Sequence, residues 1–319
     1  MVVMLNSGPF EERKNEVVST QDQRTPNALS KLVRRASQDL SKEDLSDWSA
    51  VRRTISIDPN PPIKVERIEG LQREVYVARD DLLLGGTKQR AIVPFLLDMA
   101  NEGAKEFVYA SPPSGFAQVA LASVCKHLGF PCVLFCVGRD DGGIPSANLH
   151  EFAVLAGSFG AVTYTLPYLR VAEAAATEYA SARDGAMKLP LGFDAPEFRA
   201  HLEEAIAEQW GHVLDAMGGE PSEIWLPIGS ATLGTVFRSV VPDHIHLHCV
   251  DVHVLRANDE RILRLCELPN VHYHDVPEIF TNPVEKPPPL PSNAYYDAKL
   301  WRFVSEKAAE KALWWNVAK

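Results

Sequence analysis

The chain has 319 residues, of which 46% are hydrophobic, and its formal net charge at pH 7 is −10. This length and composition provide a sizeable buried core, which excludes a largely disordered protein. The negative charge argues against a broad nucleic-acid-binding surface, because such a surface needs clustered Lys and Arg. It leaves room for a local basic pocket that holds one small anion.

The cysteines and the hydropathy of the chain predict its cellular compartment. Five cysteines without a CxxC pair favour buried thiols in a reducing compartment over disulfides or a structural zinc site. No secretory signal pattern opens the chain, and no segment approaches the length of a membrane span. We therefore expect a cytoplasmic protein with no membrane partner.

In chain order, residues 1–55 are polar and charged, and we expect them to form a partly flexible N-terminal extension. The next part predicts strands at 74–77, 106–110, 131–137 and 160–166, and helices at 89–102, 116–128 and 149–159. The C-terminal part predicts a helix at 196–217 and strands at 223–228, 246–252 and 311–317. Alternation of this kind indicates an α/β fold built on mainly parallel sheets.

The first segment that could carry chemistry is Gly85-Gly86-Thr87-Lys88, where a turn meets the 89–102 helix. A lysine at a helix start can project into a cleft between two lobes. The simpler alternative is a solvated lysine beside a glycine turn. The segment is not a Walker phosphate loop, which needs Gly-Lys-Ser/Thr after a longer spacing.

The second segment surrounds Ser114, between the 106–110 strand and the 116–128 helix. Free backbone N–H groups and a hydroxyl at a helix N-terminus form a natural seat for a carboxylate or a phosphate. Plain N-capping of the helix by Ser114 would explain the same residues.

The third segment is the loop 229–235, GSATLGT, which follows the 223–228 strand. Glycines and small hydroxyl residues at such a place can form a nest of N–H donors that suits a phosphate. Many turns between a strand and a helix look similar without binding any ligand.

Together and in this order, the three segments resemble the fold-type-II pyridoxal-phosphate enzymes, the group of tryptophan synthase β, cysteine synthase and threonine dehydratase. The run 79–90, RDDLLLGGTKQR, resembles the lysine segment of aminocyclopropane carboxylate deaminase and D-cysteine desulfhydrase, two members of the group. SGFAQVALA at 114–122 fits the frame of the substrate loop, and GSATLG at 229–234 resembles the deaminase phosphate loop. NAYYDAK at 293–299 and ALWWNVA at 312–318 resemble two further stretches, so the resemblance covers roughly 65–319.

The resemblance implies a catalytic part at 56–319 with two lobes, each a mainly parallel sheet flanked by helices, and the cofactor in the cleft between them. A smaller lobe of about 91–184 would be nested within a larger lobe made of 56–90 and 185–319. The cofactor would be pyridoxal 5′-phosphate, held as a Schiff base by Lys88. The reaction would transform an amino acid or amine at its α-carbon, as a lyase, deaminase or decarboxylase. A homodimer is expected from the same likeness.

The resemblance also implies residue roles. The catalytic residues would be Lys88, Ser114, Tyr295 and Tyr296. The cofactor would contact Lys88, Arg90, Phe116, Asn316 and the phosphate loop, which consists of Gly229, Ser230, Ala231, Thr232, Leu233, Gly234 and Thr235. The substrate would contact Ser114, Gly115, Phe116, Ala117 and Gln118.

Two positions depart from the family pattern. Phe116 stands where the family has an asparagine that binds the cofactor's O3′ oxygen. Val317 stands where the desulfhydrase-like subgroup has a threonine that partners the pyridine nitrogen, which leaves Asn316 as a candidate substitute. Both changes point away from simple deamination of a small free amino acid, and they leave room for a chain that has lost catalysis.

Two alternatives therefore stay open. One is the processing of an amino-acid adduct on a modified pyrimidine of phage DNA or its nucleotide, in the host cytoplasm, because phage forms have similar lysine and C-terminal segments. The other is a catalytically silent protein that keeps the fold for binding or structure.

His244, His246 and His248 alternate along the 246–252 strand region, and His253 lies nearby. Imidazoles at that spacing share one face and can converge on a metal. No carboxylate with ligand spacing accompanies them, so a solvated or interface face is the favoured interpretation and no metal is expected.

Overall fold

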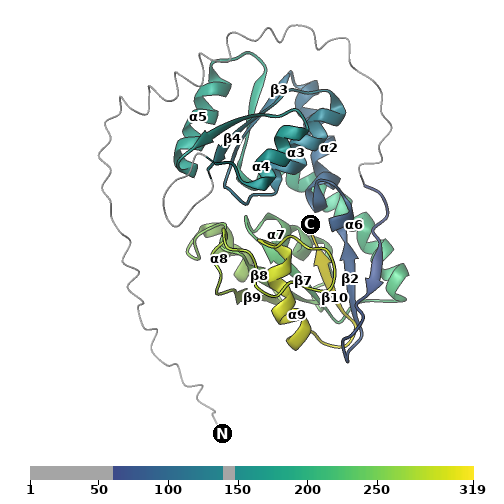
Figure 1. Ribbon diagram of the computed structural model, residues 1–319. Coiled ribbons are helices and arrows are strands. Elements are labelled where there is room, and N and C mark those ends of the chain that lie inside the picture. Colours follow the sequence, from purple (N-terminus) through teal and green to yellow (C-terminus); the bar gives the residue numbers. More distant parts are fainter. Residues whose placement is uncertain (1–59, 139–147) are drawn as a thin grey trace. The chain divides into compact units, whose positions relative to one another are not determined.

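The computed structural model describes residues 60–138 and 148–319. The predicted N-terminal extension, residues 1–55, lies outside the described residues. The described residues all belong to one compact unit of the chain, and Figure 1 shows that they form two sheets with helices against both.

The larger sheet has six strands in the order β1-β2-β10-β7-β8-β9. Its strands are β1 (Val65–Arg67), β2 (Val75–Arg79), β7 (Glu223–Ile228), β8 (His246–Asp251), β9 (Val271–Asp275) and β10 (Ala312–Asn316). Only the β1–β2 pair is antiparallel. The C-terminal strand β10 therefore lies in the interior of the sheet, and its residues Trp314 and Trp315 are fully buried.

The smaller sheet has four parallel strands in the order β5-β4-β3-β6. They are β3 (Glu106–Ser111), β4 (Cys132–Val137), β5 (Val162–Leu166) and β6 (Ala186–Leu189). Every residue of β3 is buried, which is why this strand and β4 read as continuous apolar runs rather than alternating ones.

Eight α-helices flank the sheets in the described part of the chain (Figure 1). They are α2 (Gln89–Asn101), α3 (Ala117–Leu128), α4 (Glu151–Ser158), α5 (Leu169–Ser181), α6 (Pro196–Met217), α7 (Thr232–Val240), α8 (Glu260–Cys266) and α9 (Trp301–Lys307). Local chemistry sets several ends. Gly129 ends α3 in the left-handed conformation at φ +77°, and Pro196 occupies the first turn of α6.

The predicted fold class is confirmed: the chain is α/β, with two mainly parallel sheets flanked by helices. The chain enters the larger sheet at β1 and β2, builds the whole smaller sheet, and returns through β7 to β10. The lobe boundaries at residues 91 and 184 stay a prediction, and the strand that completes the smaller sheet, β6, lies just beyond the second of them.

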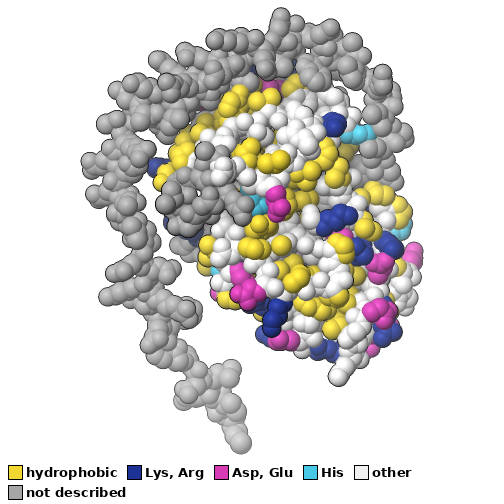
Figure 2. Space-filling view, in the orientation of Figure 1, with side chains coloured by type: hydrophobic (Ala, Val, Ile, Leu, Met, Phe, Trp, Pro, Cys, Tyr) yellow, Lys and Arg dark blue, Asp and Glu magenta, His cyan; other side chains and the backbone are white. Residues whose placement is uncertain are grey.

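Charged side chains of both signs are interspersed on the surface. On the face that Figure 2 shows, basic and acidic side chains lie beside one another over the part with the larger sheet, and apolar side chains are frequent over the part with the smaller sheet. Among the residues that the structure describes, no helix is long and apolar enough to cross a membrane.

Candidate active site

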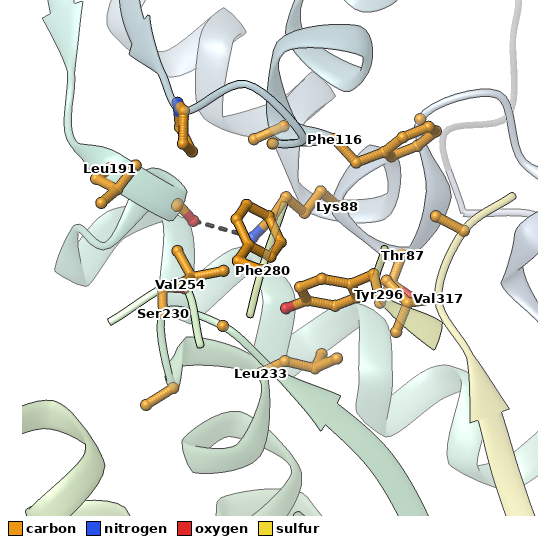
Figure 3. A pocket seen from close by; sticks show the side chains of 18 of the residues that line it. Thr87, Lys88, Phe116, Leu191, Ser230, Leu233, Val254, Phe280, Tyr296 and Val317 are labelled. Carbon is orange, nitrogen blue, oxygen red and sulfur yellow. Dashed lines mark hydrogen bonds between the residues drawn. The ribbon is translucent and has the colours of Figure 1, made fainter. Parts of the chain in front are cut away.

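One pocket brings together residues from all three predicted segments. Twenty described residues line an empty space of about 830 Å³, a volume that includes the pocket's open mouth. They include Lys88 from the first segment, Gly115–Ala117 from the second, and Gly229–Ala231 with Leu233 from the third. Figure 3 shows how these and other side chains surround the pocket. Segments far apart in the sequence thus meet around one lysine.

Lys88 ends a short 3-10 turn, Gly86–Lys88, and directly precedes α2. Its Nζ donates a hydrogen bond of 3.0 Å to the backbone oxygen of Gly192, drawn as a dashed line in Figure 3, and lies 5.6 Å from the centre of the Phe193 ring. Burial lowers the pKa of Lys88 to about 8, although the charge of Asp194 acts in the opposite direction. At pH 7 roughly a tenth of this amine is therefore unprotonated and nucleophilic, far more than for a solvated lysine.

The turn that carries Lys88 is pressed against the C-terminal end of the chain. Thr87 donates its backbone N–H to the Val317 oxygen at 3.0 Å. Gly86 has φ +62°, and a Cβ atom there would lie 2.3 Å from the same oxygen. Only glycine meets both conditions, so the second glycine of the Gly85-Gly86 pair is required by the close approach of this turn to Val317.

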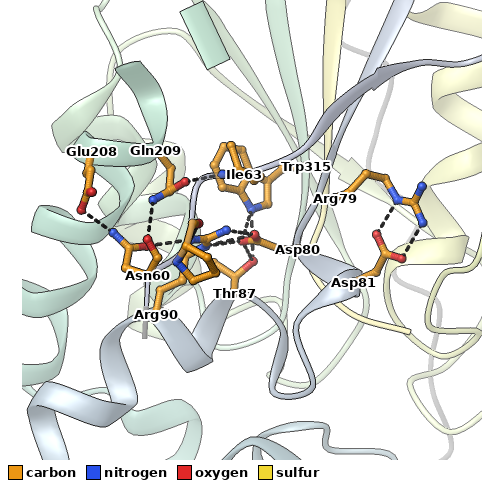
Figure 4. Close-up of polar contacts among 11 residues, drawn as sticks. Asn60, Ile63, Arg79, Asp80, Asp81, Thr87, Arg90, Glu208, Gln209 and Trp315 are labelled. Carbon is orange, nitrogen blue, oxygen red and sulfur yellow. Dashed lines mark hydrogen bonds and ion pairs between the residues drawn. The ribbon is translucent and has the colours of Figure 1, made fainter. Parts of the chain in front are cut away.

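A buried polar network holds the residues on both sides of Lys88 (Figure 4). Asp80 accepts hydrogen bonds from the Thr87 hydroxyl at 2.7 Å and from the Trp315 indole N–H at 3.0 Å. It also accepts from Arg90, through Nε at 3.0 Å and Nη2 at 2.5 Å. The network fixes the direction from which Lys88 enters the pocket.

Arg90 was expected to contact the cofactor, but its guanidinium is committed elsewhere. Besides Asp80 it donates to the Asn60 side-chain oxygen at 2.7 Å and to the Pro61 backbone oxygen at 2.8 Å. Its side chain is almost fully buried, and it is not among the residues that line the pocket. Arg90 therefore stabilises the turn that carries Lys88, through its bonds to Asp80.

The second segment contributes three consecutive residues to the pocket lining. Gly115, Phe116 and Ala117 line it, and within the described part of the chain the N–H groups of Phe116 and Ala117 have no backbone acceptor, as is usual in a first helical turn. Ser114 does not cap α3, because the N-cap residue is Phe116 and no side chain accepts there.

The two polar side chains of this segment are used internally. The Ser114 hydroxyl donates to the Phe280 oxygen at 3.3 Å. The Gln118 amide donates to the Gly115 oxygen at 2.9 Å and to the Pro113 oxygen at 3.2 Å. Both side chains are buried and neither lines the pocket, so they stabilise the loop that presents the N–H groups.

The third segment divides into a short loop and a helix start. Ala231 has φ +63° and is the N-cap residue of α7, so the expected loop 229–235 is shorter than predicted and its last four residues are helical. Gly229, Ser230, Ala231 and Leu233 line the pocket. A left-handed residue before a helix N-terminus forms a nest of N–H groups that suits an anion.

The other residues of this segment do not reach the pocket lining. The Thr232 hydroxyl pairs with Ser230 Oγ at 3.0 Å, and the Thr235 hydroxyl donates to the Ala231 oxygen at 3.1 Å. A Cβ atom on Gly234 would meet the Leu265 side chain at 2.8 Å. These residues shape the loop and pack its helix.

Of the two tyrosines, Tyr296 lines the pocket. Burial raises the pKa of its phenol above the usual range, so the hydroxyl stays protonated. Tyr295 packs its ring against His150, with 4.8 Å between centroids, and is not among the lining residues.

The end of the chain supplies an apolar wall of the pocket, made of Val317 and Ala318. Asn316 faces elsewhere, because its amide donates to the Pro291 oxygen at 2.8 Å and its oxygen accepts from Ser292 at 3.0 Å. Asp297 holds the wall by accepting the Val317 N–H at 2.6 Å and the Ala318 N–H at 3.1 Å.

Several residues of the pocket were not expected from the sequence. They are Tyr109, Leu191, Gly192, Leu202, Val254 and Phe280. None carries a local motif, and only their long-range packing brings them to Lys88. Asp80 and Asp297 lie inside the resembling stretches, yet no sequence feature identified them as supports of the site.

The histidines form pairs rather than a metal site. His246 Nδ1 lies 2.7 Å from His272 Nε2, His248 Nδ1 lies 2.9 Å from His274 Nε2, and His244 pairs with Glu220. In the described residues no group of three or more potential ligands has a geometry that could hold a metal ion.

No family model matches the chain. A tryptophan synthase β chain from Haloferax volcanii is 33% identical over 104 residues, which cover 32% of this chain and 25% of that relative. The match thus spans about a quarter of the relative's length.

Solved structures match over most of the chain. An ACC deaminase homologue superposes with a TM-score of 0.63 at 16% identity, over 82% of this chain and 91% of its own. Diaminopropionate ammonia lyase from Escherichia coli superposes with a TM-score of 0.53 at 13% identity, over 91% of this chain and 87% of its own. The chain therefore has the fold of the fold-type-II pyridoxal-phosphate enzymes, as its three segments predict.

Proposed function

We propose that the protein is a pyridoxal-phosphate-dependent enzyme that transforms an amino acid or amine at its α-carbon, as a lyase, deaminase or decarboxylase. The observation that carries the proposal is the meeting of the Lys88 amine and the 229–231 nest in one pocket. The cofactor has an aldehyde and a phosphate, and these two groups need an amine and an anion site within reach of each other.

The residues present fit this cofactor. The backbone of Gly229, Ser230 and Ala231 is the candidate seat of the phosphate, at the start of the nine-residue helix α7. A Cβ atom on Gly229 would lie 2.8 Å from the Tyr296 hydroxyl, so the glycine keeps this corner of the pocket open. The Lys88 amine is the candidate for covalent attachment, because its lowered pKa provides the unprotonated form.

Three groups of the chain would act on the substrate. The N–H groups of Phe116 and Ala117, at the start of α3, would hold a carboxylate. Lys88 would move the proton at the α-carbon, since an amine with a pKa of about 8 can serve as both base and acid near neutral pH. The Tyr296 phenol stays protonated and would donate a hydrogen bond. Bound pyridoxal phosphate supplies the electron-withdrawing ring that makes bond cleavage at the α-carbon possible.

The names of the similar proteins support the reaction class. The names refer to the synthesis of an amino acid, in tryptophan synthase, and to the release of ammonia, in diaminopropionate ammonia lyase, and a third name is that of an ACC deaminase homologue. Homodimer formation stays a prediction from the resemblance, and the cytoplasmic location stays a prediction from the sequence.

The experiment is a titration of the purified protein with pyridoxal phosphate, followed by visible absorption. We expect a yellow band in the wild type and none in Lys88→Ala, while both proteins show the same circular dichroism. A coloured protein that converts no free amino acid would favour the nucleotide-adduct alternative. Absence of colour at saturating cofactor would overturn the proposal and favour a binding or structural role.

A further inference from the structure

The polar side chains of the pocket are few. Among the twenty described lining residues, Lys88 is the one charged side chain, and four others carry a hydroxyl: Thr87, Tyr109, Ser230 and Tyr296. The pocket therefore has little to offer a second polar group of a substrate, beyond the amine and the carboxylate that the proposed function already uses.

The protein itself engages the oxygens of these hydroxyls, and the Tyr296 proton is the donor that the proposed function already uses. Thr87 donates to Asp80, Tyr109 accepts the Gly192 N–H at 3.1 Å, and Ser230 pairs with Thr232. The Tyr296 hydroxyl lies against Gly229. A polar substituent on the substrate's side chain would have to compete with these contacts or lose its hydrogen bonds to water without replacement.

Apolar side chains form the rest of the lining, as Figure 3 shows for those it labels. The larger ones are Phe116, Leu191, Leu202, Leu233, Val254, Phe280 and Val317. Phe116 follows strand β3 of the smaller sheet, whereas Val254 and Val317 follow strands β8 and β10 of the larger sheet. The apolar surface is therefore not confined to one wall of the pocket.

The two phenyl rings are held in place. Phe116 packs edge-to-face against Phe152, with 5.3 Å between ring centroids and 89° between planes. Phe280 is 8% exposed, and its ring packs edge-to-face against Tyr296, with 6.4 Å between ring centroids and 78° between planes. Rings anchored in this way cannot readily turn aside to admit a polar group, and an apolar side chain placed against them would be removed from water.

We propose that this site takes amino acids or amines with an apolar side chain, aliphatic or aromatic, and that Phe116 is the residue that sets this preference. The inference rests on the proposed function and extends it to the substrate class. Phe116 is the N-cap residue of α3 and lines the pocket beside the N–H groups that would hold the carboxylate, which is why we assign it this role. Such a side chain has no hydroxyl or amine to lose from its β-carbon, so binding is the property to measure.

The test uses pairs of amino acids with nearly the same shape and different polarity. The protein loaded with pyridoxal phosphate is titrated with valine and threonine, and with leucine and asparagine, and binding is followed by the change in the visible band and by calorimetry. We expect valine and leucine to bind roughly 100-fold more tightly than their polar counterparts, the scale on which an apolar pocket disfavours an added hydroxyl. Equal or tighter binding of threonine and asparagine would overturn the inference.

Variants locate the preference. Phe116→Asn should reduce the valine-to-threonine affinity ratio by roughly tenfold, because it removes the phenyl surface against which an apolar side chain would be buried. Phe116→Leu should keep the ratio, and so should Leu97→Asn, which makes a similar change at a side chain that is 42% exposed. If the valine-to-threonine affinity ratio is unchanged in Phe116→Asn, Phe116 does not set the substrate preference.

The outcomes separate the two proposals. If wild-type protein gains no visible band with pyridoxal phosphate, the proposed function fails and the substrate preference falls with it. If the band forms and polar amino acids bind as well as apolar ones, only the preference fails.

Discussion

Asp80 and Arg90 form a buried ion pair on either side of the Lys88 turn, with Arg90 Nη2 at 2.5 Å and Nε at 3.0 Å from Asp80 Oδ1. Their side chains are 0% and 1% exposed. Asp80 is also bonded to Thr87, the neighbour of Lys88, so one carboxylate connects both flanks of the candidate catalytic lysine.

Removal of the Asp80 charge should destabilise the fold. In Asp80→Asn the Arg90 guanidinium stays buried without its counter-charge, and breaking a buried pair in this way costs about 3–5 kcal/mol. The matched control is Asp184→Asn, which removes the exposed pair with Lys105 and should leave the free energy of unfolding nearly unchanged, because solvent screens this pair. Urea denaturation measures both values, and equal losses in the two variants would contradict the role given to Asp80.

Gly86→Ala tests the close approach of the turn to the C-terminal end. The left-handed backbone alone costs a residue with a Cβ atom about 1–2 kcal/mol, and the contact of 2.3 Å with the Val317 oxygen adds to that cost. We expect lower stability and weaker binding of pyridoxal phosphate.

Gly157→Ala in α4 is the matched control for Gly86→Ala, since a Cβ atom there meets nothing within 4 Å. In a helix this change should be neutral or stabilise by up to about 1 kcal/mol. A Gly86→Ala protein that is as stable as the wild type and binds the cofactor normally would show that the turn is not constrained.

Gly229→Ala tests the candidate phosphate seat. The added Cβ atom would lie 2.8 Å from both the Tyr296 hydroxyl and a Val254 methyl group, and an overlap of this kind costs about 1–3 kcal/mol. Because the loop relieves this overlap by shifting the N–H groups that would hold the phosphate, the dissociation constant for pyridoxal phosphate should rise roughly 10- to 100-fold. Gly211→Ala in α6, where nothing lies within 4 Å, should leave it unchanged, and the same result at Gly229 would place the phosphate elsewhere.

The rate at which the cofactor attaches should depend on pH through Lys88. The unprotonated amine is the reacting form, and burial lowers the pKa of Lys88 from 10.5 to about 8. The rate should thus rise with pH up to about 8 and level off above it. Stopped-flow absorption measures this profile, and an inflection near 10.5 would contradict a desolvated lysine.

The stability of the cofactor-free protein offers a check on the same pKa. The folded chain releases the Lys88 proton near pH 8 and the unfolded chain near 10.5, so the unfolded state binds more protons between these values. The free energy of unfolding should therefore gain from this group as pH rises from 8 to 10.5. Lys88→Met should lack this gain.

Much of the fold could be predicted because the local signals are strong. The helix at 196–217 and the strand at 223–228 have the predicted bounds, since Pro196 and Gly218 mark the ends of the helix and the strand is a buried apolar run. Strand β9 was missed, because its sequence VHYHD is polar and half exposed at the edge of the sheet. Helix α7 was missed and its first turn was predicted as loop, because Gly234 and two threonines in that turn are poor helix formers.

In the candidate site, too, the residues of local motifs could be predicted and the long-range contacts could not. Lys88 and Gly229–Ala231 belong to local motifs, and the structure brings them to one pocket. Arg90 and Asn316 lie in the resembling stretches, but their side chains bond to Asn60 and Pro291, which are far away in the sequence. Such contacts depend on how distant segments pack, and no local pattern encodes them.

The central claim is that the Lys88 amine is the group that pyridoxal phosphate binds. Reduction of the coloured protein with borohydride, followed by proteolysis and mass spectrometry, tests it most directly. We expect the reduced pyridoxyl group on the peptide that contains Lys88, and no stable label in Lys88→Ala. A label on another lysine, or an unlabelled Lys88 in a protein that is coloured, would contradict the account.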